Sequence, residues 1–255
     1  MAQPSYDFSG QVVVVTGGSR GVGAGIVAAF AAAGAQVVTC GRRPAEVPGA
    51  DFVIADVRQS DQAKAVIETA QERYGRLDVL VNNAGGSPEA PAEQASPRFV
   101  EAIVALNLLA PYYCAQAAHA VMAEQEGGGS IVNVGSVSGL RPSPGTAAYG
   151  MAKAGLINLT ATLAVEWAPA IRVNCISAGV LVTETGDENY GGPERLAQVA
   201  ATVPLGRMGQ PADVAQACLF LASPGASYIS GSNLVLHGGG EWPAVLAVPR
   251  TPEPN

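Results

Sequence analysis

The stretch VVVVTGGSRGVG, residues 12–23, decides the fold of this chain, and the alanine-rich apolar segment 24–33 follows it directly. A continuous run of β-branched residues predicts a strand buried on both faces, the glycines predict a tight turn, and the apolar segment predicts a helix. Such a unit brings backbone N–H groups and a helix N-terminus to a pyrophosphate. The spacing Gly-x-x-x-Gly-x-Gly differs, however, from the Gly-x-Gly-x-x-Gly dinucleotide pattern. Many strand-to-helix turns need glycine only for close packing, so this turn alone does not settle a function.

The same alternation continues along the chain. Predicted strands rich in Val and Ile alternate with alanine-rich helical segments, and no linker or internal repeat interrupts them. We therefore predict an α/β fold, namely a single-domain, Rossmann-type, doubly wound parallel sheet of about seven strands with helices on both faces. A length of 255 residues suits one such domain, 1–255. Its core is expected over roughly residues 8–240, followed by a C-terminal tail, 241–255.

Composition narrows the classes of function. Charged residues make up only 14% of the chain and hydrophobic residues 48%, which predicts much apolar surface and hence a homo-oligomer. The net charge of −7 and the lack of a basic run argue against nucleic acid as a partner. Residues 1–10 do not resemble a signal peptide, and no stretch approaches about eighteen uninterrupted apolar residues. We expect a soluble, cytoplasmic protein with no membrane partner.

Cysteine and histidine usage predicts no metal site. The cysteines are scattered through apolar segments without metal-ligand spacing, and we expect them to be reduced core residues: Cys40, Cys114, Cys175 and Cys218. His119 and His237 are the only histidines, which argues against a histidine-based metal centre.

A second motif, YGMAK at residues 149–153, combines a phenol with an ammonium. Positions i and i+4 of a helix lie on one face, so Lys153 can hold its charge beside the Tyr149 ring and lower the pKa of the phenol. Ser136 follows the apolar run 131–134, which predicts a place at the mouth of a buried strand. The three side chains would then converge on one substrate oxygen. Tyr-x-x-x-Lys also occurs by chance in many helices, so the other motifs decide its weight.

Two further signals complete the pattern. The sequence Asn82-Asn83-Ala84-Gly85 follows the predicted strand 77–81, and Asn107 lies in the predicted helix after it. With these motifs in order along roughly residues 8–240, the chain closely resembles the short-chain dehydrogenase/reductase family, in the subgroup with TGxxxGxG and YxxxK motifs. The resemblance places four residues on the catalytic positions of the family: Asn107, Ser136, Tyr149 and Lys153.

The resemblance implies an oxidoreductase that transfers a hydride between a nicotinamide cofactor and a carbonyl or secondary alcohol. Tyr149 would exchange the proton with the substrate oxygen, Ser136 would hold that oxygen, and Lys153 would also bind the nicotinamide ribose. Asn107 would hold a water that links Lys153 to solvent. Alternatively, a buried asparagine at this place only satisfies a backbone carbonyl.

The end of the second predicted strand, 36–40, indicates which cofactor is preferred. An acidic residue there would bond both ribose hydroxyls and repel a 2′-phosphate, but this chain has Gly41 followed by Arg42, and Arg20 lies in the glycine turn. Two guanidinium groups can flank a phosphate. The chain is thus similar to NADP-preferring members of the family, so NADP(H) is expected and NAD(H) remains an option. One or both arginines could instead point to solvent.

The resemblance also implies the other cofactor contacts. Asp56 and Val57 are placed at the adenine, Asn83 near the adenosine ribose and Thr183 at the nicotinamide carboxamide, although Asp56 could equally stabilise the following turn. The full expected set is Gly17, Ser19, Arg20, Gly21, Val22, Gly23, Arg42, Asp56, Val57, Asn83, Gly85, Tyr149, Lys153, Leu181 and Thr183. Ala178 departs from the family, which has proline before the glycine here. Its loss should leave the loop freer before folding.

The sequence does not name the substrate. The expected pocket walls are 86–97, 138–148 and the long segment 184–204, which we interpret as a mobile substrate lid. Family members that act on carrier-protein thioesters tend to present arginines where this chain has the acidic segment 124–129. A free ketone, a steroid-like compound or a CoA thioester therefore fits better. The alternative to an enzyme is a non-catalytic dinucleotide-binding sensor or structural subunit on the same fold.

Two long helices, predicted over roughly 96–124 and 148–167, bear on assembly. The resemblance implies that these helices pack against symmetry mates. We therefore expect a homotetramer in preference to a dimer.

Overall fold

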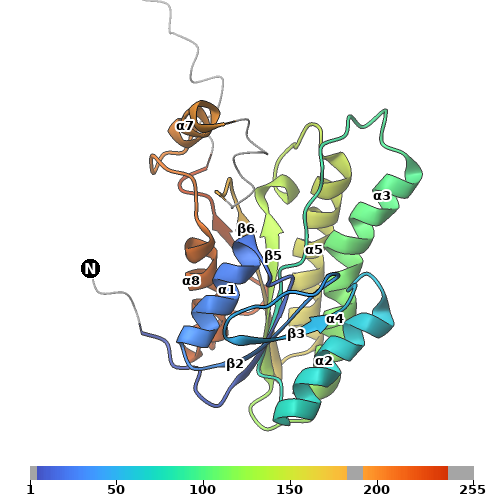
Figure 1. Ribbon diagram of the computed structural model, residues 1–255, viewed down its shortest axis with the longest axis vertical. Helices are drawn as coiled ribbons and strands as arrows, with labels where there is room; N and C mark the ends of the chain where they lie inside the picture. The colour runs from blue at the N-terminus through green and yellow to red at the C-terminus, as the bar shows by residue number, and fades with distance from the viewer. Residues whose placement is uncertain (1–4, 183–191, 241–255) are drawn as a thin grey trace, which may run out of the picture.

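A parallel sheet runs through the molecule in the strand order β3-β2-β1-β4-β5-β6-β7 (Figure 1). The computed structural model describes residues 5–182 and 192–240. Within them the strands are β1 (Val12–Thr16), β2 (Gln36–Gly41), β3 (Ala50–Ile54), β4 (Val79–Asn82), β5 (Gly129–Ser136), β6 (Ile171–Ala178) and β7 (Asn233–Leu236). Every neighbouring pair is parallel, so all the carboxyl ends lie at one edge of the sheet. The predicted seven-stranded α/β sheet is confirmed.

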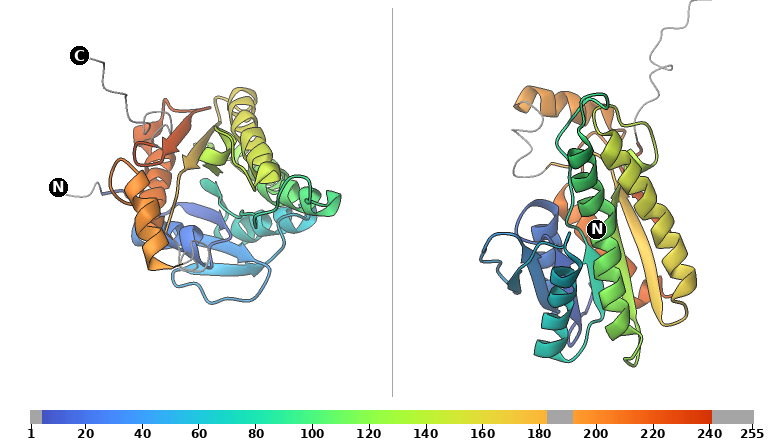
Figure 2. Two further views of the ribbon diagram at one scale, coloured as in Figure 1. Left: turned by 90° about the horizontal axis from the view of Figure 1, so that it is seen from above. Right: turned by 90° about the vertical axis from the view of Figure 1, so that its right-hand side faces the viewer.

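Helices cover both faces of this sheet (Figure 2). They are α1 (Gly21–Ala32), α2 (Ser60–Tyr74), α3 (Pro97–Val104), α4 (Ala110–Met122), α5 (Ala147–Glu166), α7 (Pro193–Thr202) and α8 (Pro211–Ala222), with a π-helical turn η1 (Ala105–Leu109) and 3-10 turns η2 (Val137–Gly139) and η3 (Pro224–Ala226). The buried apolar side chains of α1 and α8 pack in one core cluster, whereas apolar side chains of α2 and α4, with Leu163 and Ala164 of α5, pack in the cluster on the other face. The sheet is therefore doubly wound, as predicted.

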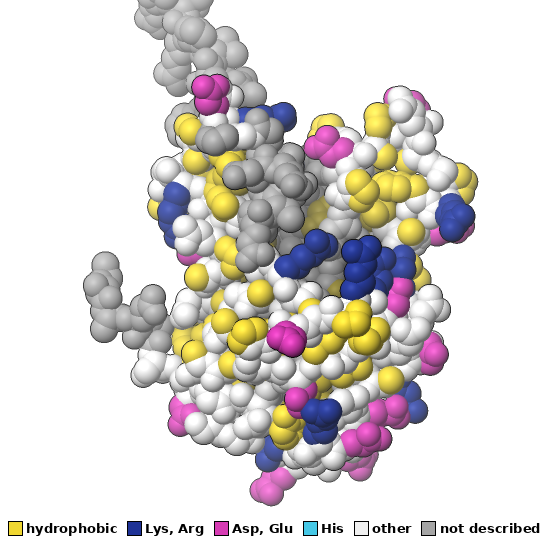
Figure 3. Space-filling model, in the orientation of Figure 1, with side chains coloured by type: hydrophobic (Ala, Val, Ile, Leu, Met, Phe, Trp, Pro, Cys, Tyr) yellow, Lys and Arg dark blue, Asp and Glu magenta, His cyan; other side chains and the backbone are white. Residues whose placement is uncertain are grey.

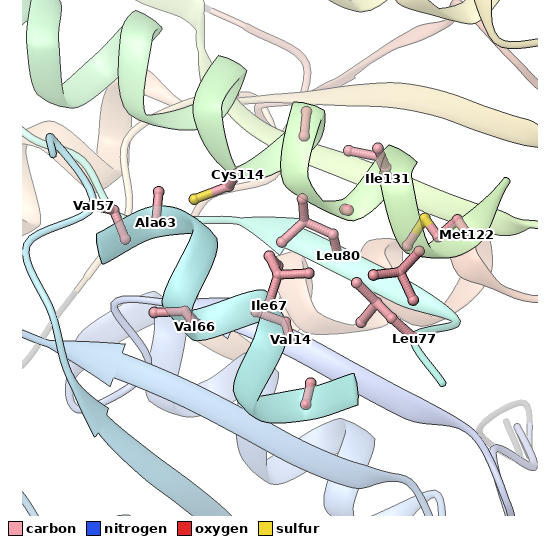
Figure 4. Packing of buried hydrophobic residues seen from close by; sticks show 14 of the residues in the cluster. Val14, Val57, Ala63, Val66, Ile67, Leu77, Leu80, Cys114, Met122 and Ile131 are labelled. Atoms are coloured by element: carbon pink, nitrogen blue, oxygen red, sulfur yellow. The ribbon is translucent and has the colours of Figure 1, made fainter. Parts of the chain in front are cut away.

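The valine run of β1 fills both clusters because successive side chains of a strand point to opposite faces. Val13 and Val15 join Ile26 of α1 in one cluster. Val14 faces the other way and packs with Ile67 of α2 (Figure 4). Each fully buried side chain of this kind contributes about 1.5–3 kcal/mol relative to an exposed one. This two-sided burial is why a continuous apolar run marks a central strand.

The helical stretch Pro97–Met122, which joins α3, η1 and α4, is by length and composition apolar enough to cross a membrane. In the fold, Cys114 and Met122 of this stretch are buried in a core cluster with Leu80 and Ile131 (Figure 4). The core helix of a globular domain passes the same test of length and hydropathy. We therefore interpret Pro97–Met122 as a core element of the domain.

The segment predicted as a mobile lid, 184–204, falls into two parts. Residues 184–191 lie outside the described residues, as does the predicted tail, 241–255. Residues 193–202 form helix α7, which the sequence analysis did not predict. The helix begins at Pro193, whose fixed φ suits the first helical position, and Glu194 adds a negative charge to the first turn.

Candidate active site

Thr16, Asn82 and Ser136 end three neighbouring strands, β1, β4 and β5, at the carboxyl edge of the sheet. The strand order reverses at β1, which lies between β2 and β4. In open parallel sheets, this switch point leaves a crevice in which ligands bind. The candidate site is built at this crevice.

The turn from β1 to α1 is shaped by glycines that leave its backbone uncovered. Gly17 has φ +69°, in the left-handed region that favours glycine, and a Cβ added to Gly23 would lie 2.2 Å from the Gly17 carbonyl oxygen. Arg20 immediately precedes α1, so the turn leads into the helix N-terminus. Such a cradle lets a pyrophosphate reach backbone N–H groups, so the residues present fit a dinucleotide cofactor. The structure brings together the predicted turn contacts Gly17, Ser19, Arg20, Gly21, Val22 and Gly23.

A second turn, after β4, is fastened to this cradle. The Thr16 Oγ1 atom accepts hydrogen bonds from the backbone N–H groups of Asn83 and Ala84, both at 3.0 Å. The Asn83 Nδ2 atom donates to the carbonyl oxygens of Thr16 at 2.9 Å and Gly17 at 3.2 Å. The Asn83 side chain thus holds the two turns together, and its predicted place near the adenosine ribose stays a prediction. Sequence analysis gave Thr16 no such role.

Ser136, Tyr149 and Lys153 come together beside these turns. Ser136 is the last residue of β5, and the other two lie on one face of α5. The Tyr149 hydroxyl lies close enough to Ser136 for that side chain to influence its pKa, and Ser136 Oγ accepts the Ser138 N–H at 3.1 Å. Lys153 is buried, with its Nζ 5.6 Å from the centroid of the Tyr149 ring and 2.7 Å from the Val134 carbonyl oxygen, to which it donates. The structure therefore brings the three side chains close together, while their convergence on one substrate oxygen stays a prediction.

Burial, however, changes the expected acidity of the pair. Burial raises the pKa of Tyr149 above its ordinary value, and the hydrogen bond with Ser136 offsets only part of this. Burial also lowers the pKa of Lys153 to about 8. The expected net lowering of the Tyr149 pKa is wrong for this structure, because burial disfavours the charged phenolate more than its surroundings favour it. Tyr149 is therefore a neutral phenol at neutral pH, which suits a proton donor.

Asn107 lies buried in the π-helical turn η1, and its side-chain amide forms hydrogen bonds with backbone groups. Its Oδ1 accepts the Gly86 N–H at 2.9 Å, while its Nδ2 donates to the carbonyl oxygens of Gly86 at 3.0 Å and Ile103 at 2.9 Å. A Cβ on Gly85 would lie 2.9 Å from Asn107 Oδ1 and 3.4 Å from Lys153 Nζ. Asn107 therefore anchors the loop after β4 against the lysine. Its predicted water-holding role stays a prediction.

The predicted adenosine end lies where β2 and β3 finish. The Ala55 N–H donates to the Gly41 carbonyl oxygen at 2.9 Å, which brings Asp56 beside Arg42. A Cβ on Gly41 would lie 3.8 Å from Ser19 Oγ, so the glycine turn borders the same place. Arg42 and Arg20 are both exposed at this edge. Figure 3 shows Lys and Arg side chains gathered near the middle of this face of the molecule.

Asp56 itself is engaged within the protein. Arg58 Nε donates to both of its carboxylate oxygens, at 2.9 and 3.0 Å, and the Asp56 N–H donates to Gln62 Oε1 at 2.7 Å. This agrees with the alternative that Asp56 stabilises the following turn, while the adenine contacts of Asp56 and Val57 stay predictions. The sequence analysis missed Arg58, because an arginine two residues after an aspartate carries no signal of its own.

The loop after β6 is fixed by Gly209. The Gly209 N–H donates to the Val180 carbonyl oxygen at 3.0 Å, and the Val182 N–H donates to the Gly209 carbonyl oxygen at 2.8 Å, so Leu181 is held between them. Ala178, which replaces the family's proline, pairs with Ser136 and Leu236 as the last residue of β6. The substitution therefore leaves the strand intact up to the loop. Thr183 lies outside the described residues.

Two of the predicted substrate walls, 86–97 and 138–148, meet near the N-terminus of α5. The Ala90 N–H donates to the Gly145 carbonyl oxygen at 2.8 Å. Beneath this contact lies a hollow of about 210 Å³, lined in part by Phe99, Val100 and Met151. Tyr149 itself does not line this hollow, although its sequence neighbour Ala148 does. Within residues 5–182 and 192–240, no group of three His, Cys, Asp or Glu side chains is placed to hold a metal ion.

The acidic segment used to argue against carrier-protein substrates lies elsewhere. Residues 123–128 connect α4 to the first residue of β5, Gly129, whereas Ser136 is the last residue of that strand. The segment is therefore at the edge of the sheet opposite the candidate site. Within one subunit the segment is thus remote from the mouth of the site, and the argument against carrier-protein substrates stays a prediction.

Comparison with known proteins identifies the family. The family profile described as enoyl-(acyl carrier protein) reductase matches residues 17–241. The chain is 37% identical to L-fucose dehydrogenase of Bos taurus, covering 92% of this chain and 90% of that protein. It is 36% identical to the 3-oxoacyl-[acyl-carrier-protein] reductase of Thermotoga maritima, covering 91% and 98%. The crystal structure of a protein assigned as a short-chain alcohol dehydrogenase from Sinorhizobium meliloti matches with a TM-score of 0.85, 35% identity, and coverage of 92% and 98%. The chain belongs to the short-chain dehydrogenase/reductase family, and it is an oxidoreductase of alcohol and carbonyl groups.

Proposed function

We propose that this enzyme interconverts a ketone or other carbonyl compound and a secondary alcohol with NADP(H), using Ser136, Tyr149 and Lys153 for the proton chemistry. The observation that carries this proposal is the Tyr149 side chain beside Ser136, with the buried Lys153 ammonium near the ring and the glycine cradle next to it. The cofactor supplies the hydride when it is bound. The residues of the chain must then hold the carbonyl oxygen and deliver a proton to it.

Each side chain has a role that follows from its contacts. The Ser136 hydroxyl lies beside the Tyr149 hydroxyl, so both can donate to the same carbonyl oxygen. The raised pKa of Tyr149 keeps its proton in place until negative charge develops on that oxygen. Lys153 then lies beside the forming tyrosinate, and Asn107 holds the loop at Gly86 in position over it.

The preference for NADP(H) rests on charge at the adenosine end. No acidic side chain stands at Gly41, while Arg42 and Arg20 are exposed beside Ser19. A 2′-phosphate placed there would accept charge-assisted hydrogen bonds from guanidinium groups. A cofactor without this phosphate would lose those bonds, and binding of NAD(H) is expected to be weaker.

Assembly and location are part of the proposal. Val165 and Met151 on α5 are 80% and 56% exposed, and Leu109 at the end of η1 and Tyr112 in the first turn of α4 are 38% exposed each. Apolar side chains on these helices favour packing against another copy, and we propose a homotetramer. Cys40, Cys114, Cys175 and Cys218 are all buried free thiols, which suits a reducing compartment such as the cytoplasm.

The test is turnover of NADPH with a panel of ketones, steroids and CoA thioesters, followed by Tyr149→Phe on any active compound. The variant keeps the ring, so cofactor affinity should stay nearly constant while turnover falls by about 10²–10⁴. Ser136→Ala should also lower turnover without a change in cofactor affinity. Wild-type turnover in Tyr149→Phe would refute the proposed site and would favour a dinucleotide-binding sensor or another active site.

A further inference from the structure

The ion pair between Asp56 and Arg58 lies at the carboxyl end of β3, beside Arg42. Arg58 donates to Asp56 from its backbone N–H at 3.2 Å and from Nε at 2.9 and 3.0 Å, and its Nη2 also contacts Oδ2. The two side chains are only 32% and 22% exposed, so the pair is held within the fold. A bidentate guanidinium of this kind fixes the direction of the carboxylate.

Asp56 also feels the second arginine. Its pKa is lowered chiefly by the hydrogen bond from Arg58, and the charge of Arg42 contributes in the same direction. The carboxylate is therefore ionised at neutral pH and lies within electrostatic reach of both guanidinium groups. Among the described residues, Arg42 has no ion-pair partner, whereas Asp56 has Arg58.

This arrangement bears on phosphate binding because a carboxylate and a phosphate compete for the same guanidinium. The Ala55 N–H donates a hydrogen bond to the Gly41 carbonyl oxygen. Asp56 follows Ala55 and Arg42 follows Gly41, so this bond brings the two charged residues near each other. An unpartnered Asp56 could turn to Arg42, occupy it, and repel an incoming phosphate. The bidentate pair with Arg58 prevents both effects.

We propose that Arg58 is a specificity-determining residue, which holds Asp56 as its counter-ion and so leaves Arg42 free for the 2′-phosphate of NADP(H). The proposal rests on the proposed use of NADP(H). In this proposal Arg58 affects phosphate binding indirectly, because its guanidinium is already paired with the Asp56 carboxylate. Its effect should therefore depend on the presence of the carboxylate.

The experiment measures dissociation constants of NADPH and NADH for the full-length protein by fluorescence titration at one ionic strength. Arg58→Met should weaken NADPH binding by about tenfold or more and leave NADH binding within about twofold. In an Asp56→Asn background, the same Arg58→Met change should have no further effect on NADPH, because there is no carboxylate left to release. Circular dichroism and thermal melting confirm that each variant is folded.

A matched control separates this local effect from loss of one positive charge. Arg73→Met breaks the ion pair with Asp51, 2.8 Å long, near the start of β3, and should leave NADPH affinity unchanged. A loss of NADPH affinity in Arg58→Met that persists in the Asp56→Asn background would mean that Arg58 contacts the phosphate directly, and it would overturn the proposal. Unchanged NADPH affinity in Arg58→Met would overturn it as well.

The proposed cofactor is judged by a different measurement. Equal affinities of the unmutated protein for NADPH and NADH would refute the preference for NADP(H). The effect of Arg58→Met on NADPH affinity would still decide the role of Arg58. Titration with 2′,5′-ADP and 5′-AMP repeats the comparison without the nicotinamide half, so that a loss confined to 2′,5′-ADP locates the effect at the phosphate.

Discussion

Replacing Lys153 by methionine should stabilise the protein at neutral pH while abolishing its activity. Lys153 is 3% exposed, and burial lowers its pKa from 10.5 to about 8. This displacement corresponds to about 3 kcal/mol that folding loses by burying the ammonium. Losing the hydrogen bond to the Val134 carbonyl oxygen, 2.7 Å long, costs about 1 kcal/mol. A net gain of about 2 kcal/mol remains, or about 4–8 °C in Tm.

The pH dependence of this gain identifies its cause. The pKa of Lys153 is lower in the folded state than in the unfolded chain, so between pH 8 and 10.5 the unfolded chain binds more protons. The unfolding free energy of the unmutated protein must rise with pH in that window, and the advantage of Lys153→Met must shrink and then reverse. Below pH 8 the advantage should be constant.

Urea denaturation of the two proteins without added cofactor, at intervals from pH 7 to 10, measures this difference. Lys64→Met is the matched control, because Lys64 is the only other lysine of the chain and its side chain is 67% exposed in a pair with Glu68. The control should change the unfolding free energy by less than about 0.5 kcal/mol at any pH. A destabilised Lys153→Met at pH 7, or an advantage that does not decline above pH 8, would refute the reasoning.

The remaining predictions concern cofactor choice and assembly. Arg42→Ala should weaken NADPH binding by about ten- to a hundredfold and spare NADH, as titration would measure, because charge-assisted bonds to the 2′-phosphate are lost. Arg43→Ala, one residue further along, is the control, and an equal loss in both variants would contradict a specific contact. Sedimentation at micromolar concentration should give a species with about four times the chain mass of 25.7 kDa. A single species of 25.7 kDa, the mass of a monomer, would contradict the proposed assembly.

Much of the fold could be predicted because its signals are local. Residues 12–15 are all valine, and a strand buried on both faces needs such a run. Gly17 and Gly23 follow where the backbone requires positive φ or a close approach. The meeting of Ser136 with Tyr149 and Lys153 was also predictable, since parallel strands end at one edge and positions i and i+4 share a helix face.

Other features depend on contacts between distant segments, which one sequence does not reveal. Asn107 was placed in a helix, but its π-helical turn and its hydrogen bonds to Gly86 exist only once two separate loops have met. Arg58 acquires meaning only when β2 and β3 bring Asp56 beside Arg42. The direction of the Tyr149 pKa depends on how much water the completed fold excludes.

Burial and the charge of Lys153 have different effects on the acidity of Tyr149. Lys153 is charged below about pH 8, and in that range the buried Tyr149 is protonated, so no tyrosinate is present to attract it. When the phenol gives its proton to a carbonyl oxygen, negative charge forms on a ring whose centroid is 5.6 Å from the ammonium. At an effective dielectric constant near 20, this attraction is about 3 kcal/mol. This attraction is absent before proton transfer, so it lowers the barrier to proton transfer without strengthening substrate binding. Burying Lys153 costs folding stability, and that burial is what holds the ammonium beside the ring.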